Sequence, residues 1–289
     1  MKIKDNKLLR YITHYPTYKL FRNTLVDNNY IILITIPKSG TNYFRLLFTN
    51  YLHCLYVQDN IPIGYSEMHN EIFPNVWDKV VRNKHYKLNA PNEIIKRTGY
   101  NDFQYSHEFP YIEFIRNSKI IFLYRNPLDF IVSYYFYKKD RLNVNVHHRI
   151  VNTDSPNEIP SIDYGLDYFT WAYSKIKNRL SNKNNVLKIC YENLLRKPIT
   201  TMEAVLSFLQ IDIHNDKIER AVEFSSKKYI IKEEEKLGHP IHGATGKENS
   251  FIRSGKIGEW KEHFSSDNLK YIEMRLNNNG IALDEFIIE

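Results

Sequence analysis

Two cationic positions in the chain could bind anionic groups. The first is the segment 37–41, Pro-Lys-Ser-Gly-Thr, which follows an unbroken β-branched and aliphatic run over 30–36. Such a run is typical of a buried strand in a parallel sheet. A glycine loop between a strand and a helix directs backbone N–H groups at a phosphate. Lys38 adds a full positive charge, and we expect Ser39 and Thr41 to add hydroxyl donors.

The spacing of this loop differs from that of a Walker A motif, in which the lysine follows a glycine. Here Lys38 precedes Gly40, so the loop is shorter and suits one phosphate group better than a triphosphate. The residues leave open the alternative of an ordinary turn between a strand and a helix with an exposed lysine.

The second cationic position is Arg125, which ends another apolar run that predicts a buried strand over 120–124. Asn126 and Pro127 then suit the start of a helix, and Asp129 suits its dipole. Ligands of open α/β sheets bind at such strand ends. A magnesium-dependent nucleotide hydrolase usually has an aspartate there, whereas arginine favours bidentate phosphate contact. The two positions predict a ligand with two anionic groups and no obligatory metal.

Two less regular regions hold further candidates. Segment 253–256, Arg-Ser-Gly-Lys, can wrap a phosphate or form a solvated basic turn. His107 lies within 56–118, the least regular part of the sequence, where prolines interrupt the pattern and short helices are expected at about 76–84 and 92–98. Long irregular regions of α/β enzymes often form substrate pockets. Because the chain has 11 histidines, position alone gives His107 little support.

The elements that must position these residues alternate between strands and helices. They predict an α/β, three-layer P-loop-type fold, with a central, mainly parallel sheet flanked by helices, in a single domain over 1–289 with its core at about 30–280. The remaining expected elements are a strand over 186–191, a mobile loop over 237–250, and helices over 43–55, 163–180, 198–209, 215–224 and 267–277.

Composition narrows the class of protein. The 289 residues are 43% hydrophobic, which predicts a packed core. Cys54 and Cys190 lie in apolar segments and are expected to be buried free thiols. No apolar run approaches the roughly 20 residues of a membrane span, so we expect a cytoplasmic protein. The net charge of +7 suits an anionic ligand, but dispersed lysines and arginines do not favour nucleic acid.

Three motifs in order resemble those of the sulfotransferases that use 3′-phosphoadenosine 5′-phosphosulfate (PAPS). Segment 37–41 resembles the 5′-phosphosulfate loop of that family, and 125–133 resembles its 3′-phosphate strand and helix. Segment 253–261 resembles its C-terminal Arg-x-Gly-x-x-Gly-x-Trp-Lys motif. The resemblance extends from residue 30 to about residue 264.

The resemblance implies a role for each matching residue. Tyr43 would lie beside the adenine, and Tyr191 and Ser225 would contact the nucleoside. The product would be adenosine 3′,5′-bisphosphate (PAP), and no metal would be required. The implied phosphate ligands are Lys38, Ser39, Gly40, Thr41 and Asn42 on the 5′ side, and Arg125, Ser133, Arg253, Ser254 and Gly255 on the 3′ side.

The resemblance also implies a mechanism. His107 falls where the family has its catalytic histidine, and an unperturbed pKa near ~6.5 would let it act as general base at neutral pH. Lys38 would stabilise the leaving phosphate, and Ser133 would hold Lys38 away until the acceptor binds. The expected acceptor is a hydroxyl of a small molecule or glycan, with a nitrogen as the alternative.

Departures from the family pattern concern the acceptor side and the assembly. Tyr105 replaces a lysine that often stands two residues before the histidine, and the segment 108–110 is one residue longer than usual. The dimer motif expected from Lys261 onward is not matched, so the oligomeric state stays open. Two alternatives from other classes are a P-loop kinase or NTPase, and a basic nucleic-acid-binding protein.

Overall fold

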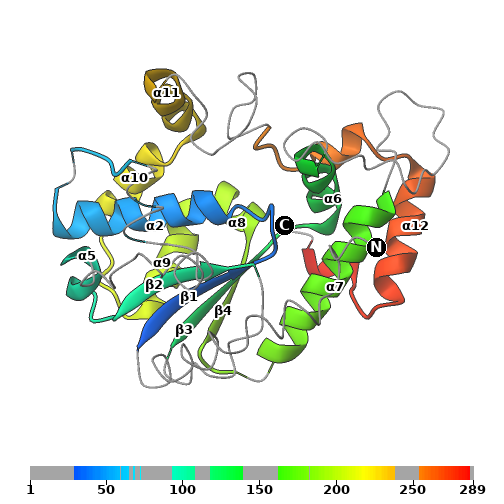
Figure 1. Cartoon of the computed structure of the whole chain (residues 1–289), viewed down its shortest axis with the longest axis horizontal. Coiled ribbons are helices and arrows are strands. Elements are labelled where there is room, and N and C mark those ends of the chain that lie inside the picture. Colours follow the sequence, from blue (N-terminus) through cyan, green and yellow to red (C-terminus); the bar gives the residue numbers. More distant parts are fainter. Residues whose placement is uncertain are drawn as a thin grey trace, which may run out of the picture.

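The computed structural model describes residues 29–58, 60–64, 68, 72, 93–107, 118–138, 162–181, 183–237 and 254–286. At its centre is a parallel four-stranded sheet with strand order β2-β1-β3-β4 (Figure 1). Its strands are β1 (Tyr30–Thr35), β2 (Asp102–Ser106), β3 (Lys119–Tyr124) and β4 (Val186–Cys190).

Three of the four strands confirm the sequence prediction. β4 ends one residue earlier than expected, because Tyr191 begins a helix instead. β2 was not predicted, whereas the helix Glu93–Arg97 confirms the short helix expected at about 92–98. The five residues of β2, Asp-Phe-Gln-Tyr-Ser, include polar side chains that are nevertheless buried, so they form no apolar run.

Helices cover both faces of the sheet, which confirms the three-layer arrangement (Figure 1). One face packs against α2 (Thr41–Tyr56), α5 (Glu93–Arg97), α8 (Tyr191–Arg196), α9 (Pro198–Leu209), α10 (Asn215–Phe224) and α11 (Lys227–Leu237). The other packs against α6 (Pro127–Phe136), α7 (Ile162–Leu180), α12 (Ser266–Asn277) and the 3-10 turns η5 (Glu259–Glu262) and η6 (Leu283–Phe286).

β1 shows why its sequence is apolar without interruption. Ile31 and Leu33 belong to the core under α2, whereas Ile32 and Ile34 belong to the core under α6 and α7. Successive side chains of a strand point to opposite faces, so a strand covered on both sides needs apolar residues at every position. β1 therefore joins the two cores.

The strand order creates a switch point at the carboxyl edge of the sheet. From β1 the chain continues to β2 on one side and then to β3 on the other. Ligands of open α/β sheets bind where the order reverses in this way. The register pairs Thr35 with Leu123 and Ile34 with Ser106, which brings Arg125 and His107 to the end of β1 from opposite sides.

Some predictions concern residues that the structure does not describe. The expected helix at 76–84, the expected loop beyond Leu237, and Arg253 lie outside the described residues. Cys54 and Cys190 are buried free thiols, as predicted. Among the helices in the described ranges, none is long and apolar enough to cross a bilayer.

Candidate active site

The loop after β1 combines two left-handed backbone positions with a close aromatic contact. Lys38 has φ 69° and Gly40 has φ 84°, and Ser39 N donates to the carbonyl of Ile36 at 3.2 Å. A Cβ placed on Gly40 would lie 2.2 Å from Cδ2 of Tyr191. Gly40 is therefore required both by its backbone conformation and by the approach of the Tyr191 ring.

Ser39 provides the clearest sign that this loop fits an anion. Its side chain is fully buried, and its hydroxyl has no hydrogen-bond partner in the described structure. Buried hydroxyls are nearly always hydrogen-bonded. The hydroxyl lies just before the N-terminus of α2, where backbone N–H groups lack helical partners. A phosphate oxygen would satisfy both kinds of donor.

The side chain of Lys38 reaches α6. Its ammonium lies 4.7 Å from the ring centre of Tyr137, the C-cap of that helix. Tyr137 follows Ser133 by one helical turn. The Lys38 ammonium therefore lies near the part of α6 that carries Ser133, another predicted site residue. The sequence analysis did not single out Tyr137, although its spacing from Ser133 was a usable signal.

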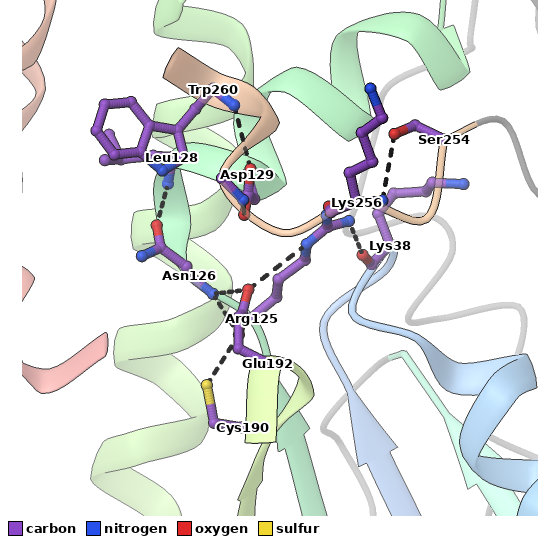
Figure 2. Close-up of polar contacts among 11 residues, drawn as sticks. Lys38, Arg125, Asn126, Leu128, Asp129, Cys190, Glu192, Ser254, Lys256 and Trp260 are labelled. Carbon is purple, nitrogen blue, oxygen red and sulfur yellow. Dashed lines mark hydrogen bonds and ion pairs between the residues drawn. The ribbon is translucent and has the colours of Figure 1, made fainter. Parts of the chain in front are cut away.

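Arg125 contacts both the loop after β1 and the C-terminal segment that contains Lys256, as Figure 2 shows. Its side chain is buried, and it donates from Nη1 to the carbonyl of Lys38 and from Nη2 to the carbonyl of Lys256, both at 3.3 Å. The guanidinium also lies 4.9 Å from the ring centre of Tyr191. Arg125 thus brings the loop after β1 and the C-terminal segment together.

Asp129 of α6 holds the C-terminal segment 254–260 by hydrogen bonds (Figure 2). This buried carboxylate accepts from Gly258 N at 2.7 Å and from Trp260 N at 3.2 Å. Within the segment, Ser254 Oγ accepts from Lys256 N at 3.2 Å, and Gly255 has φ 68°. Asp129 was expected to serve the helix dipole; its hydrogen bonds additionally anchor 254–260 beside Arg125.

Glu192 is a second buried carboxylate that the sequence analysis did not identify. It accepts from Asn126 N at 3.2 Å and from Cys190 Sγ at 2.9 Å, and its Oε1 lies 3.8 Å from Arg125 Nε. Burial raises the pKa of the Glu192 carboxyl, although these donors and the Arg125 charge oppose the shift. The contact with Glu192 helps to fix the orientation of the Arg125 side chain. Burial, together with Glu192, raises the pKa of the Cys190 thiol and makes it a poor nucleophile.

His107 lies directly after β2, against the end of β1. Its Nδ1 is 2.7 Å from Thr35 Oγ1 and 3.3 Å from the Thr35 carbonyl oxygen. Thr35 Oγ1 in turn lies 2.9 Å from Thr41 Oγ1. The candidate base and the loop after β1 therefore share one threonine.

The electrostatics around His107 correct the expected pKa near ~6.5. Burial lowers the pKa of the imidazole to about 4, and the charges of Arg45 and Lys38 act in the same direction. The hydrogen bond with the Thr35 backbone opposes the shift. His107 is therefore neutral at pH 7 in the ligand-free protein.

The other predicted nucleoside and phosphate ligands differ in position. Asn42 accepts from Arg45 Nη1 at 2.9 Å, and burial raises the pKa of Tyr43 to about 12, with Tyr191 adding to the shift. Ser225 is buried and accepts from Asn50 Nδ2 at 3.3 Å. Asn50 lies nine residues beyond Thr41, or about 14 Å along α2. Ser225 therefore lies away from the loop after β1, and its contact with the nucleoside stays a prediction.

The described residues contain no cluster of three or more histidine, cysteine, aspartate or glutamate side chains that could hold a metal ion.

Comparison with known proteins identifies the relatives of this chain. A family model described as the sulfotransferase domain matches residues 28–279. A guinea-pig (Cavia porcellus) 3-alpha-hydroxysteroid sulfotransferase is 26% identical over 83% of this chain and 80% of its own length. An amine sulfotransferase from rabbit (Oryctolagus cuniculus) is 25% identical over 81% of this chain and 75% of its own length.

Solved structures with the same fold include two complexes. A mouse sulfotransferase complexed with PAP has a TM-score of 0.56 at 18% identity, covering 91% of this chain and 89% of that chain. A retinol dehydratase in complex with androsterone and inactive cofactor PAP has a TM-score of 0.60 at 16% identity, covering 91% of this chain and 85% of that chain.

Proposed function

The chain belongs to the sulfotransferase domain family and is a PAPS-dependent sulfotransferase, and we propose that its acceptor group is a hydroxyl on a small molecule or glycan. The observation that carries the proposal is the contact of His107 Nδ1 with Thr35, which also contacts Thr41 of the phosphate-binding loop. A base and an anion site that share a residue suit group transfer between two bound molecules. The family assignment favours sulfuryl transfer over the kinase and nucleic-acid alternatives.

We propose that the two ends of the nucleotide are held by different segments. The orphaned Ser39 hydroxyl, the N–H groups around Gly40 and the Lys38 ammonium suit the 5′-phosphosulfate. Arg125, with Ser254 and Gly255 beside it, suits the 3′-phosphate. The Tyr191 ring over Gly40 and the adjacent Tyr43 are the candidates for the nucleoside. Ser133 and the undescribed Arg253 are further proposed ligands of the 3′-phosphate.

The proposed role of His107 follows from its hydrogen bonds. The carbonyl oxygen of Thr35 can only accept, so it favours the tautomer with the proton on Nδ1. Nε2 then carries the lone pair that can take a proton from the acceptor. A lowered pKa keeps this lone pair available at neutral pH.

A hydroxyl acceptor makes the best use of such a base. An alcohol oxygen becomes a good nucleophile only as it loses its proton, whereas a neutral amine already has a free lone pair. PAPS would supply the sulfuryl group, and PAP would leave as the bond between sulfur and the bridging phosphate oxygen breaks. His107 would take the hydroxyl proton as the acceptor oxygen bonds to sulfur. Lys38 would stabilise charge on the leaving phosphate, and Ser133 remains the proposed restraint on Lys38 before the acceptor binds.

The experiment compares His107→Ala with His214→Ala, which removes an exposed histidine at the N-cap of α10. Sulfated product is measured from labelled PAPS with a panel of alcohols, steroids, sugars and amines. We expect His107→Ala to lower turnover about 100-fold or more, with PAP affinity close to that of the unmodified protein. His214→Ala should behave like the unmodified protein.

Two results would contradict these assignments. Near-normal turnover of a folded His107→Ala protein would show that another group accepts the proton, and Glu108 would be the next residue to test. Sulfation of amines alone would overturn the proposed hydroxyl acceptor while leaving sulfuryl transfer intact.

A further inference from the structure

Arg45 is a fully buried cation next to the proposed base. It lies in the second turn of α2, and none of its surface is exposed to solvent. Arginine is rarely buried to this extent unless its charge is matched by specific contacts. Its surroundings therefore bear directly on what the charge does.

The guanidinium of Arg45 links the first turn of α2 to β2. Nη1 donates to Asn42 Oδ1 at 2.9 Å, and the central carbon lies 4.0 Å from the ring centre of Tyr105. The Tyr105 ring meets the His107 ring edge-on, with centroids 5.6 Å apart and an interplanar angle of 76°. Asn42, Arg45, Tyr105 and His107 thus form a continuous row of contacts.

We propose that Arg45 is a positioning residue for His107, which packs Tyr105 against the imidazole and holds a fixed positive charge that opposes protonation of the ring. This inference rests on the proposed function of His107 as the general base. Arg45 would not touch the acceptor, because its side chain is enclosed. It acts on the reaction through Tyr105 and through its charge.

Two cations act on His107 in the described structure, and they differ in how firmly they are held. Lys38, from the loop after β1, is only partly buried and has a flexible stem. Arg45, from α2, is enclosed and held by Asn42 and Tyr105. Thr35 from β1 and Tyr105 from β2 are the uncharged neighbours. Salt screens a buried charge less than an exposed one, so Arg45 provides the steadier field.

Arg45→Met tests the charge, because methionine fills much of the same volume without it. The titration midpoint of His107 is measured by NMR of the ligand-free protein with 15N-labelled histidine, and His107→Ala assigns the signal. We expect Arg45→Met to raise the midpoint by about one pH unit, as for a unit charge about 10 Å away at an effective dielectric of about 20. The acid limb of kcat/KM should move in the same direction.

Two further variants separate charge from shape. Arg45→Lys keeps the charge but loses the planar fork, so the His107 midpoint should stay within about 0.3 pH units of that of the unmodified protein. Arg220→Met removes an arginine from the exposed face of α10, where it pairs with Glu223, and should leave the midpoint unchanged.

An unchanged His107 midpoint in folded Arg45→Met would overturn the proposal. If that variant does not fold, Arg45→Lys decides, because a midpoint raised by a full pH unit despite the retained charge would overturn it equally. The titration uses neither donor nor acceptor, so its outcome is independent of whether His107 proves to be the base.

Discussion

The guanidinium of Arg125 donates to the backbone carbonyl of Lys38 at 3.3 Å, so the end of β3 is bonded to the loop that follows β1. This contact follows from the register, which pairs Thr35 with Leu123 and leaves Arg125 level with the loop. It fixes the relative position of two cationic sites at the switch point of the sheet. The pair therefore suits one ligand with two anionic groups at a set separation, as PAP has.

Replacing Arg125 should discriminate between ligands with and without a 3′-phosphate. We expect Arg125→Ala to weaken the binding of PAP by roughly 1.5–3 kcal/mol, the contribution of a charge-assisted hydrogen bond. The binding of adenosine 5′-monophosphate should weaken much less. Titration calorimetry of both ligands measures the difference. Arg220→Ala, from an exposed ion pair, is the matched control. Equal weakening of the two ligands would mean that Arg125 acts structurally or contacts the other end.

Gly40→Ala should lower the free energy of unfolding by more than the cost of placing an alanine in a left-handed backbone conformation. Gly99 has a similar φ of 78°, but a Cβ there meets nothing within 4 Å, so Gly99→Ala measures the backbone cost alone, about 1–2 kcal/mol. At Gly40 the added Cβ also collides with Tyr191. We expect Gly40→Ala to unfold at lower urea than Gly99→Ala and to lose PAP affinity, which Gly99→Ala retains. Matching behaviour of the two variants would show that the Tyr191 contact is unimportant.

The apolar sequences of the strands that are buried on both faces predicted those strands. The sequence did not predict β2, which is not an apolar run. β1 and β3 are unbroken apolar runs because helices cover each side. β2 buries Gln104 and Ser106 as well as Phe103 and Tyr105, so its sequence pattern resembles that of a loop. The closeness of His107 to Thr35 depends on β2 and could not be predicted from the pattern of residues.

The cationic ends of the site were predictable, whereas their supports were not. Lys38, Gly40 and Arg125 follow apolar runs, so their place at the sheet edge can be inferred from local order. Glu192 and Arg45 are charged residues that turn inward toward partners distant in the sequence, the Asn126 backbone and the Tyr105 ring. Periodicity treats such residues as solvent-facing, so their roles appear only once the strands and helices are assembled.

His53 should make the protein less stable in acid. Its side chain is buried in the last turn of α2, and neither ring nitrogen has a hydrogen-bond partner in the described structure. Burial lowers its pKa in the folded state. Below its unfolded pKa of about 6.5 the unfolded chain binds more protons, so the free energy of unfolding falls as pH decreases.

The variant His53→Leu should remove part of this pH dependence. Urea unfolding at pH 7.5 and 5.5 should show a smaller loss of stability for His53→Leu than for the unmodified protein. At pH 7.5 the variant should be at least as stable, because two unpaired polar atoms are removed. His214→Leu, at an exposed site, serves as the control. An unaltered pH dependence in His53→Leu would show that His53 is protonated or solvated in the folded state.

The most direct test of the account is the binding of PAP to the unmodified protein by titration calorimetry, with a chelator present. We expect tight binding of PAP without metal, and much weaker binding of ATP and of adenosine 5′-monophosphate, because only PAP offers anionic groups to both Arg125 and the loop at Lys38. Equal affinity for PAP and ATP, or a strict requirement for magnesium, would contradict it.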